Sequence, residues 1–150
     1  MYSSIKKFGN FSEEIIINYI KQVLIGLDYL HSNNVIHRDI KGDNILLTKE
    51  GEVKLADFGV SVILEQSLES KSVSFAGTPY WMAPEVIQGH KVTTTCDIWS
   101  LACTIIELLT GKPPFYDLQQ YYAFNQIVKG EPTIPENISE DLKNFLKISF

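Results

Sequence analysis

The sequence has few of the features that mark membrane, secreted or nucleic-acid-binding proteins. Its longest near-apolar stretch, from Ile98 to Leu109, is interrupted by polar side chains and is too short to span a bilayer. No apolar run near the N-terminus leads to a small-residue cleavage site, so we expect no secretion signal. Thirteen Lys and Arg stand against 18 Asp and Glu, a net charge of −5. That balance argues against nucleic acid or an anionic membrane surface as the main partner.

Cysteine is equally scarce. Cys96 and Cys103 lie seven residues apart in one expected helix, and at 1.5 Å of rise per residue they would be roughly 10 Å apart. That separation is beyond the reach of a disulfide. No Cys or His partner stands at zinc-ligand spacing. The sequence therefore predicts two reduced, largely buried thiols and a cytoplasmic protein.

What the chain does contain is the composition of one folded domain, with 150 residues and a 45% apolar share. Apolar periodicity predicts a mainly helical fold with helices over about 13–30, 95–109, 118–129 and 139–149, an ordered segment at 83–88, and a short β-hairpin of strands 45–47 and 53–55. Ser12 and Thr95 are the expected N-caps, and Gly111 should end the helix over 95–109. That helix is apolar around nearly its whole circumference and should be the buried axis of the domain. Residues 65–74 have neither periodicity and are expected to form a mobile loop.

The residues with catalytic potential lie between the first helix and the hairpin, and directly after the hairpin. Residues 37–44 read HRDIKGDN and residues 57–59 read DFG. A carboxylate (Asp39), a cation (Lys41) and an amide oxygen (Asn44) are thus close in sequence, and the hairpin returns Asp57 to the same end of the ribbon as Asn44. Such oxygen ligands suit Mg²⁺. Asp39 can orient a hydroxyl group, and Lys41 can balance charge on a transferring phosphoryl group.

Each motif alone has a plainer interpretation. An isolated DFG after a strand is usually a turn, and a single histidine such as His37 is more often a hydrogen-bonded core residue. The acidic cluster could also hold a metal for hydrolysis, although no histidine pair at ligand spacing supports that alternative. Only the combination of the motifs favours phosphoryl transfer.

In order along the chain, HRD with Asn44, DFG, and APE at residues 83–85 resemble the catalytic, C-terminal lobe of a protein kinase. The sequences GTPYWM at 77–82, DIWS at 97–100 and PPF at 113–115 extend the resemblance over essentially all 150 residues. It implies the lower lobe of the α+β kinase fold, with Ser/Thr specificity. Residues 40–42 and 77–82 are similar to the branch of MAP kinase kinase kinases and Ste20-like kinases.

The resemblance implies roles for the cluster. Asp39 would be the catalytic base that accepts the proton of the substrate hydroxyl, and Lys41 would lie near the γ-phosphate. Asn44 and Asp57 would hold Mg²⁺ beside ATP, and Leu46 would form part of the floor under adenine.

The resemblance also assigns supporting roles. Gly77 and Thr78 would shape the substrate groove for a protein carrying a Ser or Thr acceptor. His37 and Phe58 would stack in an internal column that positions the DFG aspartate, and Asp97 would anchor that column and the catalytic loop from the buried helix.

Regulation is a further hypothesis. Arg38, beside the catalytic aspartate, could pair with a phosphate placed by an upstream activating kinase on Ser70, Ser72 or Ser74. Ordinary solvated loop serines are the equally weighted alternative.

The pattern also departs from the family. No Gly-rich nucleotide loop, phosphate-binding strand lysine or partner glutamate precedes Tyr2, and no arginine follows Phe150 to pair with Glu85. We therefore expect residues 1–150 to be a C-terminal lobe truncated at both ends, with an orphaned buried Glu85, marginal stability and negligible turnover alone. The leading hypothesis is the catalytic lobe of a Ser/Thr protein kinase. A non-catalytic, kinase-like interaction module is the alternative, and a metal-dependent hydrolase is a distant third.

Overall fold

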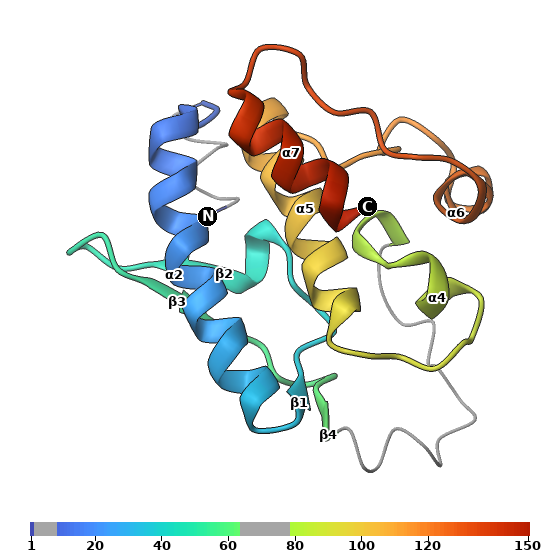
Figure 1. Cartoon of the computed structure of the whole chain (residues 1–150), viewed down its shortest axis with the longest axis horizontal. Helices are drawn as coiled ribbons and strands as arrows, with labels where there is room; N and C mark the ends of the chain where they lie inside the picture. Colours follow the sequence, from blue (N-terminus) through green and yellow to red (C-terminus); the bar gives the residue numbers. More distant parts are fainter. Residues whose placement is uncertain (2–8, 64–78) are drawn as a thin grey trace.

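Helices dominate the computed structural model, which describes residues 1, 9–63 and 79–150 (Figure 1). The helices are α2 (Glu13–Ser32), α4 (Pro84–Ile87), α5 (Thr95–Thr110), α6 (Gln120–Lys129) and α7 (Glu140–Ser149), and the short 3₁₀ turns are η1 (Gly42–Asn44) and η2 (Pro79–Trp81). The strands are β1 (Val35–Ile36), β2 (Ile45–Leu47), β3 (Val53–Leu55) and β4 (Val62–Ile63). The mainly helical fold with a hairpin is confirmed. The loop expected at residues 65–74 lies outside the described residues.

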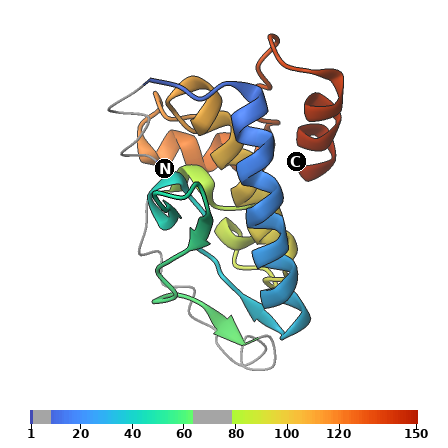
Figure 2. The ribbon, with the colours of Figure 1, turned by 90° about the vertical axis from the view of Figure 1, so that its left-hand side faces the viewer.

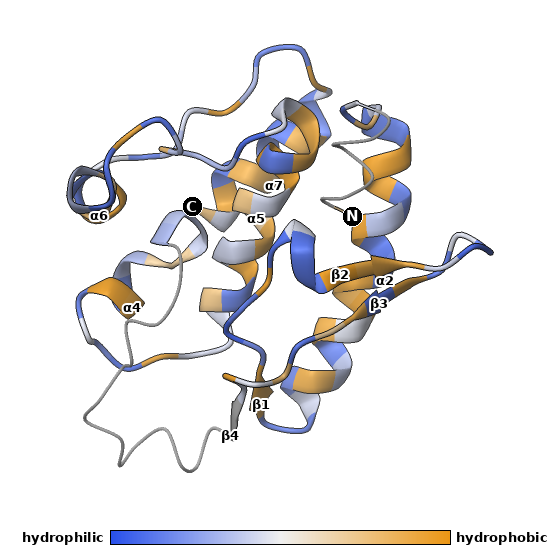
Figure 3. Ribbon diagram, turned by 180° about the vertical axis from the view of Figure 1, so that it is seen from behind, coloured by the Kyte–Doolittle hydropathy of each residue, from blue (hydrophilic) through white to orange (hydrophobic). Residues whose placement is uncertain are grey.

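Helix α5 runs through the middle of the fold and touches α2, α7, η1 and η2 (Figure 1). Leu101, Ile105 and Leu108 of α5 are fully buried, as the apolar circumference of this segment predicts. One apolar cluster packs α5 against α2 and α7, and a second packs it against α4 and the segment before it. The apolar colouring of α5 is visible in Figure 3. The expected buried axis is therefore confirmed.

Helix α2 buries one stripe of side chains at helical spacing, which are Ile16, Ile20, Val23 and Leu27. Its N-cap residue is Ser12, as expected, but the Ser12 side chain makes no capping hydrogen bond. Glu13 instead accepts hydrogen bonds from the backbone N–H and the hydroxyl group of Ser139. Ser139 in turn caps α7 by accepting a 3.2 Å bond from the Leu142 amide. The starts of α2 and α7 are thereby joined.

The two ends of α5 differ in how well the sequence predicts them. Gly111 ends the helix with φ = 85°, the left-handed conformation that glycine adopts without a steric penalty. At the other end the prediction is wrong by one residue, because Thr94 is the N-cap and Thr95 is the first helical residue. The Thr95 hydroxyl lies 2.6 Å from the Thr93 hydroxyl and 3.5 Å from a Glu85 carboxylate oxygen, so it serves the neighbouring segment and not the helix end.

Two antiparallel ribbons flank α2. The predicted hairpin pairs β2 with β3 in the register Ile45↔Leu55, and it docks on α2 through a 2.9 Å bond from the Val53 amide to the Gln22 side chain. The second ribbon pairs β1 with β4. The sequence analysis missed this ribbon because each strand has only two residues, which carry no measurable periodicity. In Figure 2 the strands lie on one side of α2, whereas α7 lies on its other side.

Cys96 and Cys103 are buried and unpaired, as predicted. Burial raises the pKa of both thiols well above the ordinary value, so they are inert at neutral pH. In the described part of the chain, no helix is long and apolar enough to cross a membrane.

The central position of α5 predicts how stability is distributed. Ile105→Ala should lower the free energy of unfolding by about 2–5 kcal/mol, since it leaves a cavity at a fully buried position. Ile148→Ala is the control, because Ile148 is 87% exposed and should change stability by less than about 0.5 kcal/mol. Urea unfolding followed by circular dichroism measures both. Equal losses would contradict the assignment of α5 as the core.

Candidate active site

The loop that carries the HRD motif is fixed at its start by a buried carboxylate of α5. Asp97 is fully buried, and it accepts hydrogen bonds from the backbone amides of His37 (2.9 Å) and Arg38 (2.8 Å). His31, at the end of α2, lies 2.8 Å from the same carboxylate. Arg38 has φ = 66°, a conformation that a non-glycine residue adopts only when its surroundings hold it there. The backbone therefore reaches Asp39 through a turn held by Asp97.

Asp39, Lys41 and Asn44 meet directly. The Lys41 ammonium donates to both carboxylate oxygens of Asp39, at 2.9 and 2.8 Å. The Asn44 amide nitrogen donates to Asp39 Oδ2 at 2.6 Å and to the Asp39 carbonyl at 2.8 Å. The side chains of Asp39 and Lys41 remain 30% and 25% exposed, so the cluster is open to solvent while Asn44 is 8% exposed. A carboxylate, a cation and an amide thus share one partly open surface.

Asp57 reaches the same end of the β2–β3 ribbon. The Ala56 amide donates to the Asn44 carbonyl at 2.9 Å, which places Asp57 one residue beyond a backbone bond to Asn44. Asp57 has φ = 62°, and its Oδ1 accepts a 3.2 Å bond from the Gly59 amide. The side chain is exposed. The sequence predicts Asn44 and Asp57 at the same end of the ribbon, and the structure places them there.

His37 links the HRD and DFG segments. The Asp39 amide donates to His37 Nδ1 at 3.3 Å, which requires that Nε2 carry the proton, and Nε2 donates to the Ala56 carbonyl at 3.1 Å. The Phe58 ring lies against the imidazole with centroids 4.9 Å apart. Burial lowers the pKa of His37, against the opposing effect of the Asp97, Asp39 and Asp57 carboxylates. The imidazole is accordingly held neutral between the two motifs.

The donor set at this ribbon end suits a hard divalent cation. Asn44 uses its amide nitrogen on Asp39, so the atom it can offer a metal is the oxygen Oδ1. Asp57 offers a carboxylate at an exposed position. Two oxygen donors beside open solvent match the preference of Mg²⁺, which keeps phosphate oxygens and waters among its ligands. Leu46, in the adjacent strand, is 51% exposed.

Two residues near the cluster were missed by the sequence analysis. His31 contacts Asp97 across 66 residues, and Glu107 contacts Gly42 across 65. Neither residue belongs to a short motif, and in the sequence Glu107 is one of the polar residues that interrupt the near-apolar stretch from Ile98 to Leu109. A buried carboxylate position within an otherwise apolar helix was the available signal, since buried charges are paired or hydrogen-bonded.

The expectation for Glu85 is corrected. Glu85 is only half-buried, and it accepts a bond from the Thr95 hydroxyl at 3.5 Å. It is therefore not an orphaned buried carboxylate, and the destabilisation expected from one does not apply. The remaining predicted residues lie outside the described part of the chain, and they are Ser70, Ser72, Ser74, Gly77 and Thr78.

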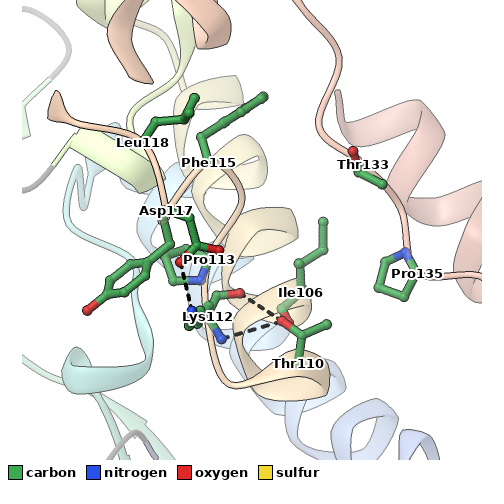
Figure 4. Close-up of a pocket in the computed structure, with 10 residues that line it drawn as sticks. Ile106, Thr110, Lys112, Pro113, Phe115, Asp117, Leu118, Thr133 and Pro135 are labelled. Atoms are coloured by element: carbon green, nitrogen blue, oxygen red, sulfur yellow. Dashed lines mark hydrogen bonds and ion pairs between the residues drawn. The ribbon is translucent and has the colours of Figure 1, made fainter. Parts of the chain in front are cut away.

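The two described pockets lie apart from this cluster. One, of about 450 Å³, lies between the turn that follows α5 and the segment before α7 (Figure 4). Its polar wall is the 2.7 Å ion pair of Lys112 and Asp117, next to Thr110. The other, of about 280 Å³, is an apolar groove between α2 and α7. None of the residues that line either pocket belongs to the Asp39 cluster.

A helical fold whose central helix anchors an HRD loop, with a hairpin that returns a DFG segment to the same place, is the arrangement expected of a protein kinase domain. The family model described as "Protein kinase domain" matches residues 1–149, and the chain belongs to that family.

Known relatives narrow the branch. The chain is 56% identical over 145 residues to MAP3K epsilon protein kinase 2 of Arabidopsis thaliana. The aligned region covers 96% of this chain and 10% of that relative. It is 54% identical over 151 residues to cytokinesis protein sepH of Aspergillus niger, an alignment that covers 100% of this chain and 11% of the relative. It is also 54% identical over 146 residues to cell division control protein 7 of Schizosaccharomyces pombe, and that alignment covers 97% of this chain and 14% of the relative. The chain spans only about a tenth of the length of these relatives. The expected similarity to the MAP kinase kinase kinase branch of Ser/Thr protein kinases is confirmed.

The neutral state of His37 predicts a pH dependence. The unfolded chain has the ordinary imidazole pKa of about 6.5, and burial lowers the pKa in the folded chain. The unfolded state therefore binds the proton more readily below pH ~6.5. The stability that His37 contributes is fully present above that pH and is lost as the pH falls through the folded value.

Urea unfolding of the wild type and of His37→Gln between pH 8 and 5 measures this effect. The difference in free energy of unfolding between the two should shrink as the pH falls, because Gln cannot ionise. A constant difference across the range would contradict the assignment.

Proposed function

We propose that this chain is the catalytic lobe of a Ser/Thr protein kinase. The complete protein transfers the γ-phosphate of ATP to the hydroxyl group of a protein Ser or Thr, whereas residues 1–150 alone have negligible turnover. The observation that carries the proposal is the direct contact among Asp39, Lys41 and Asn44, with Asp57 at the same ribbon end. Phosphoryl transfer depends chiefly on positioning and charge stabilisation, and this cluster supplies groups for both.

Each side chain has a task that its contacts support. Asp39, held by Lys41 and Asn44, orients the acceptor hydroxyl and receives its proton. Lys41 carries the positive charge that faces the transferred phosphoryl group. Asn44 and Asp57 would hold Mg²⁺, which when bound neutralises charge on the ATP phosphates. Leu46, exposed on the neighbouring strand, would contact adenine.

The proposal extends to partners. Gly77 and Thr78 would shape the groove for the protein substrate, and the relatives named for cytokinesis and cell division suggest substrates in signalling that controls division. Residues 1–150 would be the C-terminal lobe of the kinase domain, in a cytoplasmic protein. ATP and Mg²⁺ would be its cofactors.

Replacement of the proposed base tests the proposal. Asp39→Asn keeps the side-chain shape but removes the proton acceptor, and we expect kcat to fall by about 10²–10⁴-fold. The assay is transfer of labelled phosphate from Mg-ATP to a generic protein acceptor by the complete protein. Asp28→Asn, at an exposed position of α2, is the matched control and should keep wild-type activity.

The outcomes of this assay separate the candidate functions. Loss of transfer in Asp39→Asn alone supports the kinase. Absence of transfer by the wild type, together with retained binding of a partner protein, would instead support the non-catalytic interaction module.

Activation by phosphorylation is tested separately. If Arg38 pairs with a phosphate on the segment of residues 70–74, then alanine at Ser70, Ser72 and Ser74 together should reduce the activated rate of the complete protein by at least about tenfold. Treatment with a phosphatase should lower wild-type activity to the same level. Unchanged activation of the triple variant would contradict the assignment.

A further inference from the structure

Glu107 is a carboxylate in the interior of the fold. It lies near the C-terminal end of α5 and is only 2% exposed. Burial raises its pKa, as does the nearby Asp43 carboxylate, while hydrogen bonds from Gly42 and Trp81 lower it. An acidic side chain in such a place is tolerated only when specific donors hold it. Its partners therefore indicate what it does.

Both hydrogen-bond donors reach a single oxygen of Glu107. The Gly42 amide donates to Oε2 at 3.0 Å, and the indole nitrogen of Trp81 donates to the same oxygen at 3.2 Å. Gly42 belongs to the catalytic loop, between Lys41 and Asn44. Trp81 belongs to η2, in the segment that leads from the expected substrate groove into α4. Glu107 thus connects two separate segments of the site to the central helix.

The fit at Gly42 is close. A Cβ atom at this position would lie 3.0 Å from Glu107 Oε2 and 3.2 Å from Oε1. The absence of a side chain at residue 42 therefore helps the loop backbone to approach the carboxylate this closely. A side chain at residue 42 would press on the Glu107 carboxylate, so the loop or the Glu107 side chain would have to shift to admit it.

The contacts of α5 with the catalytic loop are made at two places. Asp97 holds the amides of His37 and Arg38, and Glu107 holds the amide of Gly42. Asp39 and Lys41 lie between these anchors. The spacing of the two anchors along a rigid helix therefore fixes the length over which the loop must turn. A loop held at both ends keeps its side chains in one geometry, which is what positioning catalysis requires.

Trp81 is held in the same way. The Ser100 hydroxyl of α5 lies 2.7 Å from the Trp81 carbonyl, while Glu107 accepts the indole N–H. Both ends of this residue are thus attached to one helix.

We propose that Glu107 is a positioning residue for phosphoryl transfer, which sets the catalytic loop and the Trp81 segment in register with each other. The proposal rests on the kinase function proposed above. Glu107 acts through Gly42 and Trp81 and need not touch ATP or the substrate. Removal of its carboxylate should consequently lower kcat and leave the KM for the acceptor nearly unchanged.

Kinetics of the complete protein test the role. We expect Glu107→Ala to lower kcat by about 10-fold or more, the scale expected when hydrogen bonds to a charged group are lost. Glu107→Gln retains an oxygen acceptor and should recover a large part of that loss. Thr104→Val is the matched control, because Thr104 is equally buried on α5 and its hydroxyl donates only to the Ser100 carbonyl of the same helix. It should keep wild-type kcat.

Amide hydrogen exchange of the same variants gives a second readout, which needs no activity. Exchange at Gly42 and at the Trp81 indole should accelerate by about tenfold or more in Glu107→Ala, and less in Glu107→Gln. Thr104→Val should leave both rates unchanged relative to the rest of α5. If Glu107→Ala does not fold, Glu107→Gln and Trp81→Phe carry the same comparison.

The proposal would be overturned if exchange at Gly42 were unchanged in the Glu107 variants, or if their loss of kcat were no larger than that of Thr104→Val. It would also be overturned by a raised KM for the acceptor with unchanged kcat, because that result would make Glu107 a substrate contact. Wild-type protein without phosphotransfer activity would instead refute the kinase function, and the exchange measurements would still decide whether Glu107 positions the loop.

Discussion

The structure of the site depends on one buried carboxylate. Asp97 is removed from water, and a buried charge is costly unless several donors compensate it. Its donors are the amides of His37 and Arg38, and His31 lies against the same carboxylate. These contacts hold Arg38 in a left-handed conformation that is otherwise unfavourable. Asp39 follows directly, so its direction is decided by a helix some sixty residues further along the chain.

A second feature of the fold is the division between buried support and exposed chemistry. The residues that hold the loop, His37 and Asp97, are fully buried, whereas Asp39, Asp57 and Phe58 are partly or largely exposed. Preorganised sites need this arrangement, because a reacting group must meet its substrate while its supports stay fixed. In the proposed kinase, the burial of α5 would therefore support catalysis as well as stability.

The predictable part of the site is the part that local sequence determines. Lys41 and Asn44 reach Asp39 because they lie within five residues of it, and Asp57 returns through a hairpin whose turn is visible in the sequence. The contacts of His31 and Glu107 span more than sixty residues, and no short pattern encodes them. The β1–β4 ribbon was not predicted for a different reason, since its strands of two residues are too short for periodicity. Apolar periodicity located the long helices correctly, whereas the N-cap of α5 was predicted one residue too late.

The polar residues of α5 reconcile its apolar character with its role as an anchor. Thr104 gives its hydroxyl to a carbonyl of its own helix, which satisfies a buried polar group without any partner outside the helix. Asp97 and Glu107 lie near opposite ends of the helix, and each accepts a hydrogen bond from a backbone amide of the loop. Ser100 faces the Trp81 carbonyl. A helix with an apolar surface all round could pack equally well in several rotations. One with acceptors at fixed positions fits only the rotation in which loop amides meet them, so these polar residues set the register between the core and the site.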